Sequence, residues 1–410
     1  MNAPERITER MPERTPERTP ERLSSSISLP AANGTIERYQ LSVPRNFPAT
    51  PEGAFTRVAY SAAHVVADPL KEQNPWIDCA IDWDATLNFR RHVWRLGLGV
   101  AEAMDTAQRG MGMDWPTSLE LIRRSIDASK DIKGAFLASG AGTDHLAPED
   151  AKSIDDVIRA YEEQIAAIEK LGGKIILMAS RALARVAKSP DDYHRVYDRV
   201  LSQVKEPVII HWLGDMFDPA LHGYWGSADH GLAMDAAVAA INRNAAKVDG
   251  VKVSLLDKDK EIAMRRRLAK EVKMYTGDDF NYAELIEGDE QGYSHALLGI
   301  FDAIAPAASA ALTALAQNDR QTFNQILAPT VPLSRHIFNA PTRFYKTGVV
   351  FMAYLNGLQD HFVMVGGQQS ARSILHLAEL FRLADQAGCL RDPDLACARM
   401  RATLAVHGIV

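Results

Sequence analysis

The sequence predicts an α/β protein whose main part is a (β/α)8 TIM barrel. Between residues 55 and 305, short apolar runs alternate with amphipathic segments that carry charges. Eight such units within roughly 250 residues favour a closed barrel of parallel strands over an open sheet. No GxGxxG follows the first strand, which argues against a dinucleotide-binding fold.

The eight expected strands are short and apolar. They comprise residues 57–65, 100–106, 134–139, 174–179, 207–212, 250–255, 272–276 and 292–298. The segments between them have the features of helices. Residues 153–173, for example, begin with a serine cap, carry apolar residues at helical spacing and end at two glycines.

The two ends of the chain differ from the barrel region. After residue 305 the strand pattern stops, and helical spacing predicts a C-terminal helical extension over residues 306–410, packed on the barrel. The first 26 residues repeat a Glu-Arg pair every four residues and carry several prolines. Because proline interrupts helices and little here is apolar, we expect residues 1–26 to form a disordered tail.

Composition narrows the class of protein. Of the 410 residues, 47% are apolar and 24% charged, and the net charge of −6 does not favour binding to nucleic acid. The most apolar stretch, residues 296–316, is interrupted by Asp302 and Pro306, so no membrane span is expected. Cys79, Cys389 and Cys397 have no metal-ligand spacing, and we expect a reducing, cytoplasmic location.

Lys252 lies inside the sixth expected strand. Because side chains alternate along a strand, Val251 and Val253 should face the helices and Lys252 the barrel interior. Burial lowers the pKa of a lysine, and a neutral amine can attack a carbonyl to form a Schiff base. From spacing alone, an equally good interpretation is a lysine that reaches the barrel mouth or pairs with Asp278 or Asp279.

The motifs around this lysine resemble the dihydrodipicolinate synthase and N-acetylneuraminate lyase family of class I aldolases. In that family a Gly-x-Lys ends the sixth strand and the lysine forms the Schiff base, and the match here is Gly250-Val251-Lys252. Residues 96–110, 205–214 and 275–300 resemble its strands two, five and seven to eight. The resemblance covers residues 55–330 and indicates a divergent dihydrodipicolinate-synthase-like branch. It implies a small-molecule carbonyl substrate and a homo-oligomer.

Departures from the family pattern define the other candidate residues. His211 occupies the place of the family's catalytic tyrosine and is the candidate proton shuttle, with a core histidine as the alternative. On strand two, Thr106 matches one of two threonines that hold a substrate carboxylate, and its partner is missing. Asp105 would repel a carboxylate, although Arg109 could restore its binding. A sugar-derived ketone or aldehyde is therefore at least as plausible as pyruvate.

Four more residues complete the expected substrate site. Ser139, like Thr106, is a candidate to hold the substrate carbonyl or hydroxyls, and Asp278 and Asp279 should shape the mouth. Trp225 lies in a long loop after strand five, where an aromatic ring suits stacking on a sugar or contact with another subunit.

The predicted activity is that of a lyase that performs retro-aldol cleavage, condensation or dehydration of a keto-sugar or 2-keto acid, and we expect no cofactor or metal. A metal-dependent sugar epimerase or isomerase is the second hypothesis. Its ligands would come from His64, His211, His295, Glu102 and Asp105 at the barrel mouth. A barrel that binds ligands without catalysis is the third.

Overall fold

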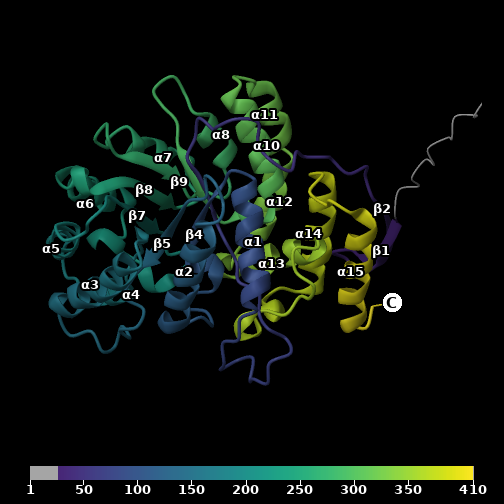
Figure 1. Cartoon of the computed structure of the whole chain (residues 1–410), viewed down its shortest axis with the longest axis horizontal. Helices are drawn as coiled ribbons and strands as arrows, with labels where there is room; N and C mark the ends of the chain where they lie inside the picture. Colours follow the sequence, from purple (N-terminus) through teal and green to yellow (C-terminus); the bar gives the residue numbers. More distant parts are fainter. Residues whose placement is uncertain (1–25, 410) are drawn as a thin grey trace, which may run out of the picture.

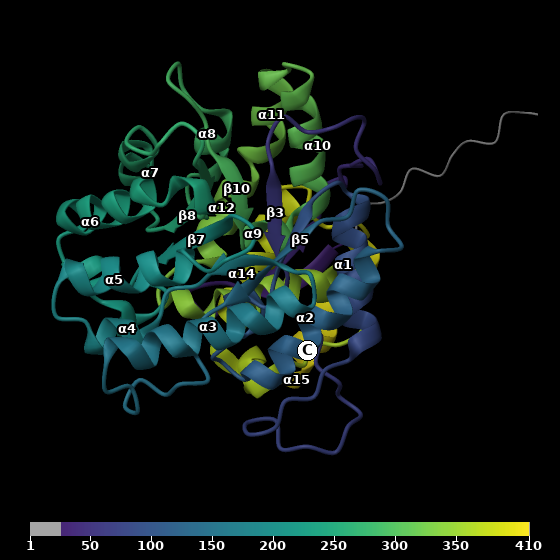
Figure 2. The ribbon, with the colours of Figure 1, turned by 60° about the vertical axis from the view of Figure 1, so that its left-hand side comes forward.

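In the computed structural model, which describes residues 26–409, eight parallel strands close into a barrel (Figures 1 and 2). The order around the barrel is β10-β3-β4-β5-β6-β7-β8-β9. The strands are β3 (Ala59–Ala62), β4 (Gly99–Glu102), β5 (Leu137–Ala141), β6 (Lys174–Leu177), β7 (Val208–Leu213), β8 (Val248–Ser254), β9 (Lys273–Thr276) and β10 (His295–Leu298). The predicted TIM barrel is confirmed.

Helices cover the outside of the barrel in the βα order (Figure 2). They are α1 (Trp83–Arg95), α2 (Trp115–Ser129), α3 (Ile154–Lys170), α4 (Arg181–Val186), α5 (Pro190–Leu201), α6 (His230–Arg243), α7 (Lys258–Arg265) and α8 (Tyr282–Glu287). The cap predicted for the segment 153–173 is present, since the Ser153 side chain accepts from the Asp156 amide and the Asp156 carboxylate accepts from the Ser153 amide.

Side-chain alternation divides the strand residues into two sets. One set fills the barrel interior and includes Tyr60, Ala62, Ala101, Ala138, Ile176, Ile209, Tyr275 and Leu297. The other set, which includes Val251 and Val253, packs in the larger core between strands and helices. The prediction that these two valines face the helices is therefore confirmed, and Lys252 between them points inward.

The second strand is shorter than predicted. It ends at Glu102 because Ala103 adopts a left-handed conformation (φ 52°), and the chain then enters the 3-10 helix η1 (Asp105–Ala107). Gln108 also has a positive φ of 63°. Asp105 and Thr106 consequently lie on a tight turn at the C-terminal end of β4, and not in the strand.

From Ile300 onward the described chain is built from helices and connecting turns, which lie to one side of the barrel (Figure 1). The helices are α9 (Ile300–Ala303), α10 (Ala305–Ala316), α11 (Arg320–Leu327), α12 (Thr330–Ile337), α13 (Tyr345–Leu355), α14 (Ile374–Gln386) and α15 (Pro393–Val406). None of the described helices is long and apolar enough to cross a membrane.

A hairpin that the sequence reasoning missed precedes the barrel. Its antiparallel strands are β1 (Ser26–Pro30) and β2 (Ile36–Gln40), and it packs on α14 and α15 (Figure 1). The Tyr39 hydroxyl donates to the Asp385 carboxylate at 2.8 Å, and Arg382 donates to the Pro30 carbonyl at 2.9 Å. Except for Ser26, which begins β1, the tail predicted over residues 1–26 lies outside the described residues.

Candidate active site

A cavity of about 470 Å3 opens where strands β4 to β7 end. This is the end of a TIM barrel at which active sites are found, and the volume suits a small molecule. Asp105 follows β4, Gly142 and Thr143 follow β5, and Met178 follows β6; all four line the cavity. His211, near the end of β7, completes the inner wall.

Lys252 lies beside this cavity, on the strand next to His211. The two residues are direct register partners across β7 and β8, and both belong to the inward-facing set. Gly277 makes room for the lysine, since a Cβ at that glycine would lie 2.8 Å from Lys252 Cε. Lys252 itself is not in the cavity wall; its neighbour His211 and the nearby Asp105 are.

The environment of Lys252 lowers its pKa. Burial, which leaves 7% of the residue exposed, is the main cause, and the charges of Asp105 and Asp279 partly oppose it. Lys252 makes no hydrogen bond or ion pair with any of the residues 26–409, so it is not locked to an acid.

Only one of the two ring nitrogens of His211 has a hydrogen-bonding partner among the described residues. Its Nε2 is 3.2 Å from the Ser254 hydroxyl, whereas Nδ1 is buried and has no partner among the described residues. Burial and the charge of Lys252 hold the pKa of His211 well below its usual value, so the ring is neutral near pH 7. A neutral imidazole with a free nitrogen can accept or donate a proton at the cavity wall.

Thr106 and Asp105 lie together on the 3-10 turn after β4. The Thr106 hydroxyl is 2.7 Å from the hydroxyl of Tyr345, the first residue of α13. The Tyr345 ring also stacks on Phe338, which fixes its position. Tyr345 was missed from the sequence because it lies on a helix far along the chain, where the barrel pattern gives no signal.

Asp279 lies near enough to Lys252 for the two charges to interact, and Asp278 forms the turn that precedes Phe280. Asp279 Oδ1 accepts from the Ile300 amide at 2.9 Å, and burial raises the pKa of Asp279 to about 7. Asp278 accepts from the Phe280 and Asn281 amides and so closes the turn after β9. Neither acid forms an ion pair with Lys252, so the pairing considered from sequence is not present.

A second buried lysine was also missed. Lys346, next to Tyr345 on α13, is 4% exposed and donates to the Arg343 carbonyl at 3.0 Å. Burial lowers its pKa to about 8, while Asp105 and Asp218 raise it. The lysine follows a loop with no strand-like pattern, so only its burial in the folded chain reveals it.

Two expected substrate contacts are wrong. Ser139 follows the inward-facing Ala138 on β5, so it points outward to the helix layer, where its hydroxyl is fully buried and unpaired. Trp225 is also fully buried, and its ring stacks on Tyr197 of α5 at 4.4 Å between centroids. It is a core residue, so it offers no face to a sugar or to another subunit.

Arg109 serves the structure of the site and has no free donor for a substrate carboxylate. Its side chain is 1% exposed, and all five N–H groups are directed at acceptors. These acceptors are the Asp144 carboxylate, the Gln164 side chain and the carbonyls of Ala103 and Gly140. The arginine thus ties the ends of β4 and β5 together.

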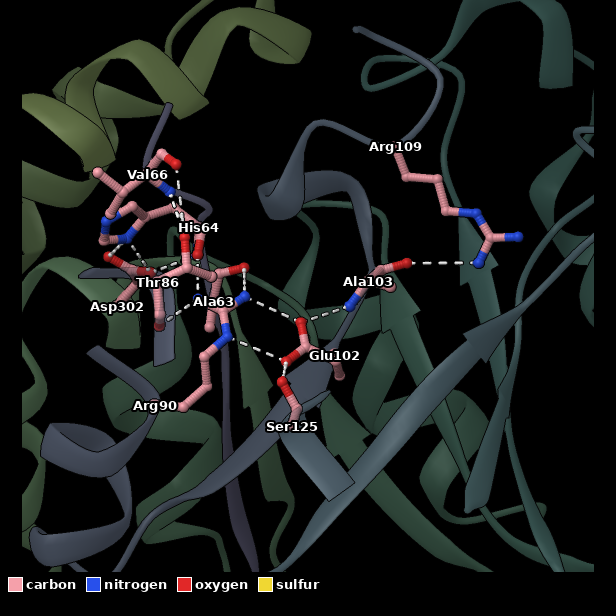
Figure 3. A network of polar contacts seen from close by, with 10 residues as sticks. All are labelled: Ala63, His64, Val66, Thr86, Arg90, Glu102, Ala103, Arg109, Ser125 and Asp302. Atoms are coloured by element: carbon pink, nitrogen blue, oxygen red, sulfur yellow. Dashed lines mark hydrogen bonds and ion pairs between the residues drawn. The ribbon is translucent and has the colours of Figure 1, made fainter. Parts of the chain in front are cut away.

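A buried polar network lies on the outer side of β3 and β4 (Figure 3). Arg90 of α1 forms a fully buried ion pair with Glu102, at 2.9 Å, and also donates to the His64 carbonyl. His64 Nδ1 is 2.8 Å from the Asp302 carboxylate. Glu102 and His64 are therefore satisfied behind the strands and do not reach the cavity.

The metal hypothesis also fails at His295. This residue begins β10, so it lies at the opposite, N-terminal end of the barrel, where its Nδ1 accepts from the Val58 amide at 2.9 Å. Within residues 26–409 there is no group of three or more His, Cys, Asp or Glu side chains placed to hold a metal ion. The expectation that His64, His295 and Glu102 meet at the mouth is wrong.

A family model described as "Protein of unknown function (DUF993)" matches residues 27–409. The chain belongs to this family. No curated protein matches the sequence.

Several solved structures share the fold. A dihydrodipicolinate synthase from Oceanobacillus iheyensis is 13% identical, with a TM-score of 0.60 over 80% of this chain and 95% of that chain. A putative dihydrodipicolinate synthetase from Pseudomonas aeruginosa is 14% identical, with a TM-score of 0.61 over 82% and 100%. The enzyme from Acinetobacter baumannii, solved in complex with pyruvate, is 16% identical, with a TM-score of 0.58 over 81% and 99%.

These similarities confirm the expected resemblance at the level of the fold: the DUF993 chain has the dihydrodipicolinate synthase fold. At identities of 13–16% they show the fold alone. A shared fold does not determine the reaction, which depends on the residues of the site.

Proposed function

We propose that this DUF993 protein is a Schiff-base-forming lyase of the class I aldolase type, acting on a keto-sugar or a 2-keto acid. The observation that carries the proposal is Lys252, a buried lysine with a lowered pKa, without an ion pair, beside a cavity at the C-terminal end of a barrel. An amine held in this way is available as a nucleophile for a carbonyl carbon.

In the proposed reaction the uncharged Lys252 amine adds to the substrate carbonyl, and the carbinolamine loses water to give an iminium. In the aldol direction the iminium accepts the electrons of an adjacent C–C bond, which breaks, or forms in the reverse direction. In a dehydration it accepts the electrons of an adjacent C–H bond, and the resulting enamine expels a hydroxyl group, which takes up a proton and leaves as water. His211 carries the proton that the carbinolamine oxygen needs in order to leave as water. Its support is the free Nδ1 of a neutral ring, on the strand next to Lys252.

The remaining residues would hold the substrate or shape the mouth. Thr106, fixed by its bond to Tyr345, is proposed to hold a substrate oxygen, and its neighbour Asp105 lines the cavity wall. Asp279 acts electrostatically on Lys252, and Asp278 keeps the turn after β9 in place. No cofactor has a part in this proposal.

The alternatives have less support. A metal-dependent epimerase lacks a ligand cluster within residues 26–409. A purely binding barrel gives no reason for a buried, unpaired lysine, since such a group costs stability that only function would retain. We further propose a cytoplasmic homo-oligomer, on the resemblance and on the free state of Cys79, Cys389 and Cys397.

Borohydride trapping with peptide mass spectrometry tests the proposal. The protein is incubated with a panel of keto-sugars and 2-keto acids, reduced, and mapped for the added mass. We expect the adduct on Lys252, its loss in Lys252→Ala, and its retention in Lys346→Gln, the matched control at the other buried lysine. An adduct on Lys346, or none with any member of the panel, would refute the assignment.

The role of His211 has its own measurement. His211→Phe should slow the rate of imine formation, measured by quenching with borohydride at successive times, more than it weakens substrate binding. If only the affinity changes, His211 is not the proton shuttle.

A further inference from the structure

Asp105 differs from the other charged residues of the cavity wall. Arg109 pairs with Asp144, Arg181 pairs with Asp218, and Asp114 accepts from the Thr117 amide. Within residues 26–409, the Asp105 carboxylate is the acid of this wall that has neither a hydrogen bond nor an ion pair. It is an acceptor with both oxygens available to a ligand.

The backbone holds Asp105 at the cavity wall. Its turn lies between two residues of positive φ, Ala103 and Gln108, and its neighbour Thr106 is bonded to Tyr345. The Gln108 side chain donates to the Val365 carbonyl at 2.6 Å, which ties the turn to the C-terminal region. A carboxylate positioned in this way is preorganised and loses little freedom when it binds a ligand.

Asp105 also lies close to the reacting amine. Its charge is the largest electrostatic influence on Lys252, and it acts on Lys346 in the same way. Neither lysine is within ion-pair distance of it. Because Asp105 and the register partner of Lys252, His211, line the same cavity, a substrate bound to Lys252 that occupies this cavity would have its substituents near the Asp105 carboxylate.

We propose that Asp105 determines specificity by accepting a hydrogen bond from a substrate hydroxyl, so that the substrate is a hydroxylated ketone or aldehyde of the sugar type. In a 2-keto acid the carboxylate is attached directly to the carbonyl carbon, and it would face Asp105 charge to charge. Arg109 cannot offset this repulsion because its five N–H groups are already bonded. The proposal rests on Schiff-base formation at Lys252.

A pair of small probes tests this. Hydroxyacetone and pyruvate are both three-carbon methyl ketones, and they differ in carrying a hydroxymethyl group or a carboxylate next to the carbonyl. The rate of borohydride-trapped labelling of Lys252 is measured for each at equal concentration. We expect the wild-type chain to label at least about tenfold faster with hydroxyacetone than with pyruvate.

Two variants test whether Asp105 is the residue that causes the preference for hydroxyacetone over pyruvate. Asp105→Asn keeps the shape but not the charge, and it should reduce the ratio of the two rates to about one, with faster labelling by pyruvate. Asp235→Asn makes the same charge change outside the cavity, at an exposed acid that pairs with Arg267, and should leave the ratio within about twofold of wild type. Unfolding curves verify that both variants are folded.

The outcomes separate the two proposals. If both probes label the wild-type Lys252 at equal rates, the role of Asp105 is overturned, whereas Lys252 remains the Schiff-base residue. This comparison uses the wild-type protein alone. An unchanged ratio in Asp105→Asn would also overturn that role. Failure of both probes, together with the wider panel, to label Lys252 would overturn the Schiff-base proposal and this one with it.

Discussion

Replacement of Lys252 by methionine should stabilise the protein while it removes trapping. Methionine keeps an unbranched side chain of similar length, and so preserves the packing over Gly277, but it lacks the ammonium group. The Lys252 amine has no hydrogen bond to any described residue. The residue is 7% exposed, so burial removes most of the amine's water without supplying a protein partner, and the loss of such a donor's hydrogen bonds costs about 1–3 kcal/mol.

Two acids reduce this gain without reversing it. Asp105 and Asp279 attract the lysine charge, and removal of that charge leaves them buried or half-buried. Asp279 can respond by taking up a proton, because its pKa is already about 7. We therefore expect Lys252→Met to raise the free energy of unfolding by about 1–3 kcal/mol at pH 7.

The pH dependence of the free energy of unfolding tests independently whether Lys252→Met is stabilising. Because the pKa of Lys252 is lowered on folding, the unfolded chain binds a proton that the folded chain resists, and wild-type stability rises with pH across this window. The advantage of Lys252→Met should therefore be larger at pH 6 than at pH 10. Urea unfolding at both pH values measures it.

Lys130→Met is the matched control, since the Lys130 side chain is 67% exposed and should change stability by less than about 0.5 kcal/mol. If Lys252→Met instead lost 2 kcal/mol or more, Lys252 would be a structural cation, and the reasoning that makes it a nucleophile would be refuted.

Three further predictions test the surroundings of the site. Burial raises the pKa of Glu261 from 4.5 to about 8, so wild-type stability falls as the pH rises from about 5 to 8. In urea unfolding, Glu261→Gln should be within about 1 kcal/mol of wild type at pH 5 and about 5 kcal/mol more stable than wild type at pH 9, and equal pH profiles would contradict this. Arg109→Lys should lower the free energy of unfolding by about 3–5 kcal/mol, because Asp144 and Gln164 lose donors, and a change under 1 kcal/mol would show that the network is dispensable. Trp225→Ala should cost about 3–5 kcal/mol in the same measurement yet leave Lys252 trapping intact in the folded protein; lost trapping at unchanged stability would restore its role in binding.

The strands were predictable because each apolar run lies between helical segments with clear caps and periodicity. Lys252 was placed correctly for a local reason: apolar valines on both sides define the outward face of β8. Ser139 has small neighbours, Ala138 and Gly140, which give no such contrast. Whether the Ser139 side chain points into the barrel or toward the helices therefore could not be predicted from the sequence.

The rest of the site depends on contacts between distant segments. Tyr345 reaches the turn after β4 from α13, and no spacing rule connects it with the strands. The isolation of the Asp105 carboxylate depends on Arg109 and Arg181 having other partners and on Lys252 lying beyond ion-pair distance. Burial of Trp225 likewise follows from the packing of α5 against the loop, not from the loop sequence.

The hairpin formed by β1 and β2 brings opposite ends of the chain together. Arg401 on α15 donates to the Ser26 carbonyl, so the first and last described elements are spatial neighbours. A peptide that links these two elements would allow new chain termini to be placed in a surface loop, as in a circular permutation, without changing the order of strands around the barrel. During translation, by contrast, the surface on which this hairpin packs does not exist until α14 and α15 have been synthesised.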